Sequence, residues 1–135
     1  MKFEDFVPLL FIAALFVGFH FLRQKLLGPT VTVDELAKML EADEISVLDI
    51  RTQEEFYGNL GHITGAANIP VGDLGEELSN WREGDGDKDA PIVTICRTHN
   101  RSPRAARMLR DAGFKNVVVL KGGMVAWKGK GLPVE

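Results

Sequence analysis

The chain has a single cysteine, Cys96, so no disulfide can form within it. Positive charge is not in excess either: 16 Lys and Arg against 19 Asp and Glu give a formal net charge of −3, which argues against a nucleic-acid partner. Intrinsic disorder and a disulfide-stapled mini-protein are also excluded. Apolar residues make up 45% and charged residues 26% of the 135, the mix of one globular domain of ordinary size.

An apolar run near the start of the chain stands apart from the rest. Residues 6–22 carry no formal charge, and Pro8 falls in the first turn of the expected helix, where a missing N–H costs little. At about 1.5 Å per residue such a helix spans roughly 25 Å, close to the ~30 Å hydrocarbon core of a bilayer. We therefore expect residues 1–27 to form a membrane anchor, with its helix at about 6–22, and residues 28–135 to form a separate domain.

Two alternatives compete with the anchor, a cleaved signal peptide and a buried core helix. A signal peptide would need a positive start and a small-x-small cleavage site, and the sequence has neither. Orientation follows the basic residues, with Lys2 on one side of the run and Arg23 and Lys25 on the other. The basic residues after the run outnumber those before it by two to one, which favours a single-pass membrane protein with residues 28–135 in the cytoplasm. A lone reduced cysteine also fits that compartment.

The rest of the chain predicts helices alternating with strands. Thr32 and Glu35 have the spacing of a capping box, which marks the start of the first helix. The helices are expected at 32–40, 52–57, 74–81, 102–112 and 124–127, and the strands at 45–50, 66–69, 91–96 and 117–120. Because each strand is nearly all apolar, the pattern indicates an α/β sandwich with a parallel sheet.

The chemical signal lies between the strand at 91–96 and the helix that follows it. Cys96 ends the strand, and only residues 97–101 separate it from the helix start. A tight loop at the carboxyl end of a parallel strand points backbone N–H groups inward and adds the positive end of the helix dipole. Such a loop binds anions and favours a thiolate, and Arg97 and Arg101 strengthen both effects. The alternative is that Cys96 is an inert buried thiol.

Three separated blocks of the sequence resemble the rhodanese-like domain. They comprise Leu48 to Arg51 with Glu54 to Phe56 and Gly61 to Pro70, then Cys96 to Ser102, then Phe114 to Leu120 with Gly122 to Trp127 and Gly131 to Pro133. Together the blocks cover roughly residues 30 to 135, in the order and spacing of that family. The resemblance implies a three-layer sandwich, with a central and mostly parallel sheet flanked by helices, in addition to the transmembrane helix.

The resemblance also implies a sulfurtransferase that needs no metal or organic cofactor. Cys96 would take a sulfane sulfur from thiosulfate or a persulfide donor and pass it to a thiol or to cyanide. The expected partners are thus a small anionic sulfur donor, a thiol or protein acceptor, and the membrane. The residues expected to bind the donor are Arg97, Thr98, His99, Asn100, Arg101 and Ser102, with Asp49 and Arg51 in support.

Two other functions fit the same resemblance. Phosphatases and arsenate reductases of this fold use a loop one residue longer, which makes them the weaker enzyme hypothesis. A non-catalytic module that recruits a partner protein to the membrane is the alternative from another class. His99 stands where many members have Gly, so it either adopts a left-handed backbone or acts as a proton donor or cation.

Several charged residues near the expected site have structural interpretations beside the functional ones. Asp49 and Arg51 fit a structural ion pair as well as a role in the site. Glu54 and Glu55 are interpreted as helix-start charges and not as paired acid and base carboxylates. His62 is expected to form internal hydrogen bonds, and no second His or Cys stands at metal-ligand spacing.

Overall fold

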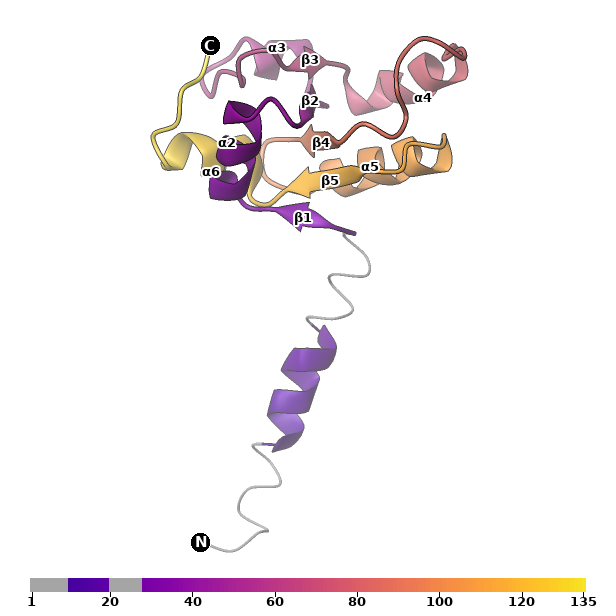
Figure 1. Cartoon of the computed structure of the whole chain (residues 1–135). Helices are drawn as coiled ribbons and strands as arrows, with labels where there is room; N and C mark the ends of the chain where they lie inside the picture. Colours follow the sequence, from indigo (N-terminus) through magenta and orange to yellow (C-terminus); the bar gives the residue numbers. More distant parts are fainter. Residues whose placement is uncertain (1–9, 20–27) are drawn as a thin grey trace, which may run out of the picture.

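The computed structural model describes residues 10–19 and 28–135 of the chain (Figure 1). In this part of the chain five strands form one sheet of order β1-β5-β4-β2-β3, and each pair of neighbouring strands is parallel. The parallel α/β sheet predicted from the apolar strands is therefore confirmed. The strands are β1 (Thr30–Val31), β2 (Ser46–Asp49), β3 (Ala67–Asn68), β4 (Ile92–Ile95) and β5 (Val117–Leu120).

Five helices alternate with these strands. They are α2 (Val33–Glu41), α3 (Gln53–Phe56), α4 (Val71–Ser79), α5 (Ser102–Asp111) and α6 (Gly123–Gly129). Each of them overlaps a predicted helix, although α4 begins at Val71 and not at Leu74. Pro70 explains the earlier start, since it is the N-cap and its carbonyl accepts hydrogen bonds from the backbone N–H groups of Asp73 and Leu74.

Two capping boxes fix the starts of helices in this domain. The predicted box of Thr32 and Glu35 is confirmed, because each side chain accepts a hydrogen bond from the backbone of the other. A second box, which was not predicted, joins Thr52 and Glu55 at the start of α3. At four residues α3 is too short to be stable as an isolated helix, so its cap and its tertiary contacts hold it.

The strand β1 was not predicted. It has only two residues, too few to show a hydrophobic period. It forms because it extends the sheet beside β5, where Thr30 is in register with Val119 and Val31 with Leu120. The pairing secures the start of the domain, since the backbone N–H of Val119 also bonds to the carbonyl of Pro29.

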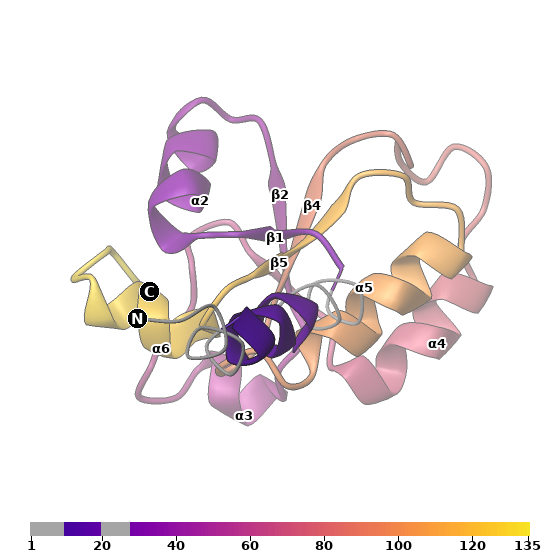
Figure 2. The same cartoon turned by 90° about the horizontal axis from the view of Figure 1, so that it is seen from below.

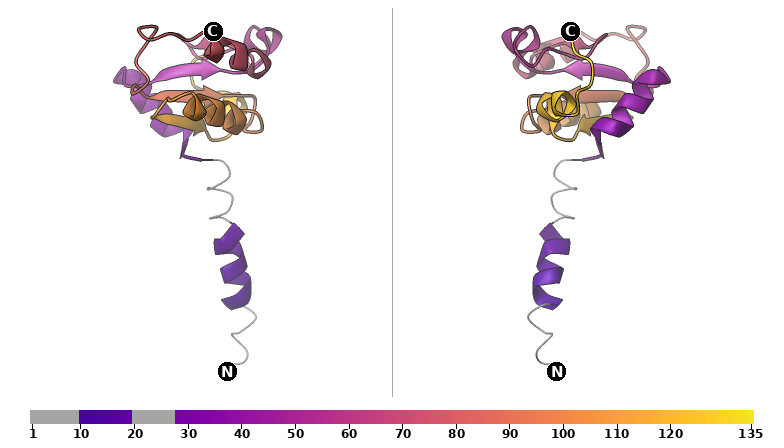
Figure 3. Two further views of the ribbon diagram at one scale, coloured as in Figure 1. Left: turned by 90° about the vertical axis from the view of Figure 1, so that its right-hand side faces the viewer. Right: turned by 90° about the vertical axis from the view of Figure 1, so that its left-hand side faces the viewer.

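The sheet separates two apolar clusters, one on each face, as the predicted three-layer sandwich requires. Successive residues of β2 face opposite ways, so Val47 joins one cluster and Leu48 the other. The first cluster lies under α2 and α6 and includes Leu36, Met124 and Trp127. The second lies under α4 and α5 and includes Leu74, Ala105 and Leu109. Figures 2 and 3 show these two pairs of helices on opposite sides of the sheet.

Residues 10–19 form a helix whose apolar side chains are exposed, from 51% at Ile12 to 72% at Phe16. The anchor helix predicted at about 6–22 reaches beyond this helix at both ends, into residues that lie outside the described part of the chain. Across 10–19 and 28–135, no helix combines the length and the apolar character that a membrane crossing requires. The transmembrane helix stays a prediction.

Candidate active site

Cys96 lies where the sequence predicted it, directly after β4, the central strand of the sheet. It is 1% exposed and belongs to the apolar cluster that contains Ala105 and Ala106 of α5. These two small residues let α5 approach the strand end closely. The loop of residues 97–101 then leads directly into α5, with Pro103 in its first turn.

The start of α6 holds the carbonyl groups of this loop. The backbone N–H of Met124 donates to the carbonyl of Cys96, and that of Val125 donates to the carbonyl of Arg97, both at 3.0 Å. In a trans peptide the N–H points opposite to the C=O. The N–H groups of Arg97 and Thr98 therefore point away from α6.

The N–H groups of the loop form no hydrogen bonds with other residues in the described part of the chain. Within residues 28–135, no backbone N–H of residues 97–101 donates to a backbone or side-chain acceptor. The loop residues are exposed or half-buried, so these N–H groups are open to solvent or to a ligand. These donors stand before the ten-residue helix α5, whose N-terminus carries partial positive charge. This is the arrangement of an anion-binding loop.

The Ser102 hydroxyl adds a further unpaired donor at the start of α5. Ser102 is fully buried, and its Oγ has no hydrogen-bond partner within the described residues. Its backbone carbonyl, by contrast, accepts a hydrogen bond of 3.2 Å from the hydroxyl of Thr94. An unpartnered buried hydroxyl is rare in a folded protein and often marks a functional site.

Two glycines allow α6 to approach the loop. Gly122 and Gly123 have φ of +81° and +58°, in the left-handed region that favours glycine. A Cβ atom on Gly123 would lie only 2.7 Å from the carbonyl oxygen of Arg97. Sequence reasoning gave Gly123 no role in the site, since the close approach of α6 becomes visible only in the folded chain.

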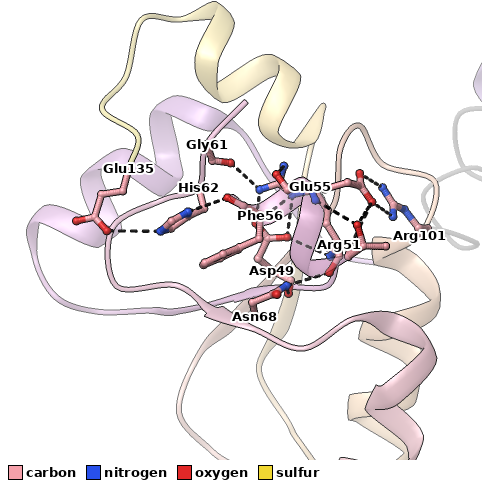
Figure 4. A network of polar contacts seen from close by, with 10 residues as sticks. Asp49, Arg51, Glu55, Phe56, Gly61, His62, Asn68, Arg101 and Glu135 are labelled. Carbon is pink, nitrogen blue, oxygen red and sulfur yellow. Dashed lines mark hydrogen bonds and ion pairs between the residues drawn. The ribbon is translucent and has the colours of Figure 1, made fainter. Parts of the chain in front are cut away.

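Arg101 forms a bidentate ion pair with Glu55 of α3 (Figure 4). Arg101 Nη1 lies 2.6 Å from Glu55 Oε1, and Arg101 Nη2 lies 2.8 Å from Glu55 Oε2. The hydrogen bond from Arg101 is the main reason that the pKa of Glu55 falls from 4.5 to about 2. The same contact with Glu55 is the main reason that the pKa of Arg101 is raised.

The interpretation of Glu55 as a helix-start charge is confirmed, and the ion pair gives the same carboxylate a second contact. Glu55 does cap α3, since Oε1 accepts from the backbone N–H of Thr52 at 3.3 Å, but its carboxylate also pairs with the loop. The two partners stand 46 positions apart in the chain, so no local pattern reveals the contact. Glu54 keeps its helix-start interpretation and is exposed.

Asp49 and Arg51 form the structural ion pair that was one of their two interpretations. Arg51 Nη2 lies 2.7 Å from Asp49 Oδ2, and both side chains are 1% exposed. The guanidinium also donates to the carbonyl of Gly61 at 2.7 Å and to that of Glu55 at 3.1 Å. The pair is therefore closed to solvent, and it supports the site indirectly by holding the backbone of α3.

His62 and His99, the two histidines within residues 28–135, differ in what the structure shows. The prediction for His62 is confirmed: its Nδ1 lies 2.9 Å from the Phe56 carbonyl oxygen, and its ring stacks on Phe56 at 3.7 Å between centroids. His99 is half-buried in the loop, and its φ is not positive, so the left-handed backbone that was one of its two interpretations is wrong. The donor-binding roles of loop residues 97–102 stay predictions.

Comparison with known proteins shows which family the chain belongs to. Residues 32–130 match the rhodanese-like domain, and they include the loop, α3 and α6. The chain belongs to the rhodanese-like domain family.

Single-domain sulfurtransferases are among its relatives. Thiosulfate sulfurtransferase GlpE of Shewanella oneidensis is 37% identical over 97 residues, which cover 72% of this chain and 89% of that protein. The solved structure of the human single-domain sulfurtransferase TSTD1 has a TM-score of 0.68 at 26% identity, covering 76% of this chain and 97% of the other. The rhodanese-like family and these relatives support the sulfurtransferase class.

Other relatives differ in how much of the chain they match. The protein YibN of Escherichia coli is 29% identical over 125 residues, which cover 93% of this chain and 83% of that protein. This similarity extends to residues before Gly28. Three further curated relatives are longer, and the chain spans 44%, 54% and 52% of their lengths, about half.

Proposed function

We propose that this rhodanese-like chain moves a sulfane sulfur from thiosulfate or a persulfide donor to a thiol or cyanide acceptor, through a Cys96 persulfide. One observation carries the proposal. Cys96 stands at a strand end beneath a loop whose N–H groups at residues 97–101 have no acceptor among the described residues, while α6 holds the carbonyls of Cys96 and Arg97. Free donors of this kind stabilise negative charge on a group that arrives in the loop.

Two displacements at sulfur make up the reaction. The Cys96 thiolate attacks the terminal sulfur of thiosulfate, the S–S bond of thiosulfate breaks, and its electron pair leaves with sulfite. The product is a Cys96 persulfide, with negative charge on its outer sulfur. An acceptor thiolate or cyanide then attacks that outer sulfur, and Cys96 leaves as the thiolate. Each step moves one electron pair, so neither requires a metal or an organic cofactor.

Roles for the loop residues follow from their positions. The N–H groups from Arg97 to Ser102, with Thr98, His99 and Asn100 between them, would stabilise the outer sulfur of the persulfide. Arg97 is exposed and placed to attract the anionic end of a donor, whereas Arg101 is half-buried and would bind that end in competition with Glu55.

The burial of Cys96 favours sulfur transfer over phosphoryl transfer. Cys96 is only 1% exposed, so steric access to its thiolate is narrow. A small terminal atom of the substrate reaches the thiolate more easily than an atom surrounded by other groups. The sulfane sulfur of thiosulfate is a small terminal atom, whereas the phosphorus of a phosphate ester is surrounded by oxygens. The five-residue loop supports the same choice over the phosphatases and arsenate reductases, whose loop is one residue longer.

Intact-mass measurement of the full-length protein after incubation with thiosulfate tests this proposal. We expect the wild type to gain the mass of one sulfur atom and to lose it on addition of cyanide or dithiothreitol. Cys96→Ala should gain nothing. If neither thiosulfate nor a low-molecular-weight persulfide loads the wild type, the chain is not a sulfurtransferase, and partner recruitment becomes the better hypothesis.

We also propose that the apolar segment at about residues 6–22 anchors the chain as a single-pass membrane protein with the domain in the cytoplasm. The exposed apolar side chains of residues 10–19 and the basic residues after the segment support this topology. The expected result is retention in membranes after alkaline carbonate extraction, with a fluorescent reporter active when fused after Glu135. Extraction into the soluble fraction would overturn the anchor, and an active periplasmic-type alkaline phosphatase fusion would overturn the orientation.

A further inference from the structure

We propose that Glu55 determines the charge preference of the site: its carboxylate occupies the Arg101 guanidinium, and Glu55 thereby selects against dianionic sulfur donors. The inference rests on the proposed sulfur transfer. It assigns to Glu55 a specificity role that differs from its capping of α3.

The contact itself is the kind that a donor would otherwise make. Both Nη atoms of Arg101 bind the two oxygens of Glu55, at 2.6 and 2.8 Å. A sulfonate group presents two oxygens to a guanidinium in the same bidentate geometry as a carboxylate. The carboxylate and the sulfonate end of thiosulfate therefore compete for one edge of the same side chain.

Hydrogen bonds fix both the side chain and the backbone of Glu55 and so hold its carboxylate against Arg101. Its Oε1 accepts from the backbone N–H of Thr52, and the backbone carbonyl of Glu55 accepts from the buried Arg51. Arg51 is in turn fixed by Asp49. Donor binding at Arg101 must therefore displace an anchored carboxylate, and the pKa of about 2 keeps that carboxylate ionised near neutral pH.

The ion pair also changes the charge that a donor meets. Arg101 is the last residue of the loop that follows Cys96, and Glu55 pairs with it directly, so the charge of Glu55 bears on this loop. With Glu55 present, the cation at the end of the loop is neutralised, and Arg97 is the other arginine of the loop. A donor with two negative charges loses more from this neutralisation than a donor with one.

Two donors that differ in charge and share a terminal sulfur make the test direct. Thiosulfate is a dianion, and methanethiosulfonate has a methyl group in place of one charged oxygen and is a monoanion. We would measure kcat and KM for both donors with full-length wild type, Glu55→Gln and the control Glu54→Gln. Glutamine keeps the shape of Glu55 and an acceptor oxygen for the cap. Glu54 is the exposed neighbour in α3 and forms no ion pair within the described residues.

For Glu55→Gln we expect kcat/KM for thiosulfate to rise about threefold to tenfold, mostly through a lower KM. The reason is that Arg101, once freed from the carboxylate, attracts the dianion in a partly exposed site. The gain for the monoanion should be clearly smaller, and Glu54→Gln should change neither donor by more than about twofold because its charge is solvent-exposed. The ratio of the two kcat/KM values is independent of how much protein is folded, since both donors are measured on one preparation.

The Arg101 partner provides a second arm. In an Arg101→Gln background the competition for the guanidinium no longer exists, so Glu55→Gln should shift the donor ratio less than it does with Arg101 present, through the charge of Glu55 alone. An equal fall for both donors in Glu55→Gln, or an equal shift of the ratio in Glu54→Gln, would overturn the specificity role. If Glu55→Gln does not fold, the ratio of the two kcat/KM values is measured on Glu55→Asp, whose shorter side chain draws the carboxylate back from Arg101. Failure of the wild type to load with either donor would instead refute the proposed sulfur transfer.

Discussion

Replacing Asp49 with asparagine should destabilise the domain strongly, since it leaves the Arg51 guanidinium buried without its counter-charge. Arg51 Nε donates to Asp49 Oδ1 at 2.9 Å, and Nη2 donates to Oδ2 at 2.7 Å. Asparagine keeps the size of the side chain and one acceptor oxygen. It loses the negative charge and turns an NH₂ group toward a side chain that can only donate.

The magnitude follows from the burial of the pair, whose side chains are both 1% exposed. Removing one partner of a buried ion pair costs about 3–5 kcal/mol, because the remaining charge is neither solvated nor paired. A domain of this size has a free energy of unfolding of about 5–15 kcal/mol, so the loss is a large share of the total. At a slope of about 2 kcal/mol per M, the urea midpoint should fall by about 2 M.

Urea unfolding of the full-length protein, followed by tryptophan fluorescence, measures this loss. Asp89→Asn is the matched control, since Asp89 pairs with Lys115 at 3.3 Å and the two side chains are 66% and 75% exposed. Breaking such a surface pair should cost less than about 1 kcal/mol. If Asp49→Asn lowers the free energy of unfolding no more than Asp89→Asn does, the argument from buried charge is wrong.

Two further predictions concern the loop. Gly123→Ala would push a methyl group against the carbonyls of Cys96 and Arg97 at a backbone φ of +58°. We therefore expect the free energy of unfolding to fall by about 1–3 kcal/mol and sulfur transfer to fall at least tenfold. Gly129→Ala is the control, because its methyl group meets open space and should change neither quantity. Unfolding measured from pH 6 to 2 should show the Glu55 contribution. Because its pKa is lowered from 4.5 to about 2, Glu55 stabilises the fold above pH 4.5 and loses that effect as the pH falls toward 2. In Glu55→Gln this part of the acid dependence should disappear, and an unchanged acid profile would contradict the ion pair with Arg101.

Local patterns in the sequence determined most of the secondary structure and the place of Cys96, the proposed nucleophile. The strand at 117–120 and the capping box at Thr32 were predicted as the structure has them, because each depends on residues within a few positions of one another. Cys96 was placed at the end of a strand for the same reason, since an apolar run followed by a short loop and a helix is a local signal.

Only the tertiary structure decided how that nucleophile is surrounded. The Glu55 and Arg101 side chains stand 46 positions apart, and the turn of α6 at Gly123 meets the carbonyls of Cys96 and Arg97 from another part of the chain. The two-residue strand β1 likewise forms only because β5 is there to pair with it. Contacts of this kind depend on the distances between folded elements and leave no period or spacing in the sequence. The sequence therefore predicts which residue reacts, and the packing of α3 and α6 decides the charge and geometry around it.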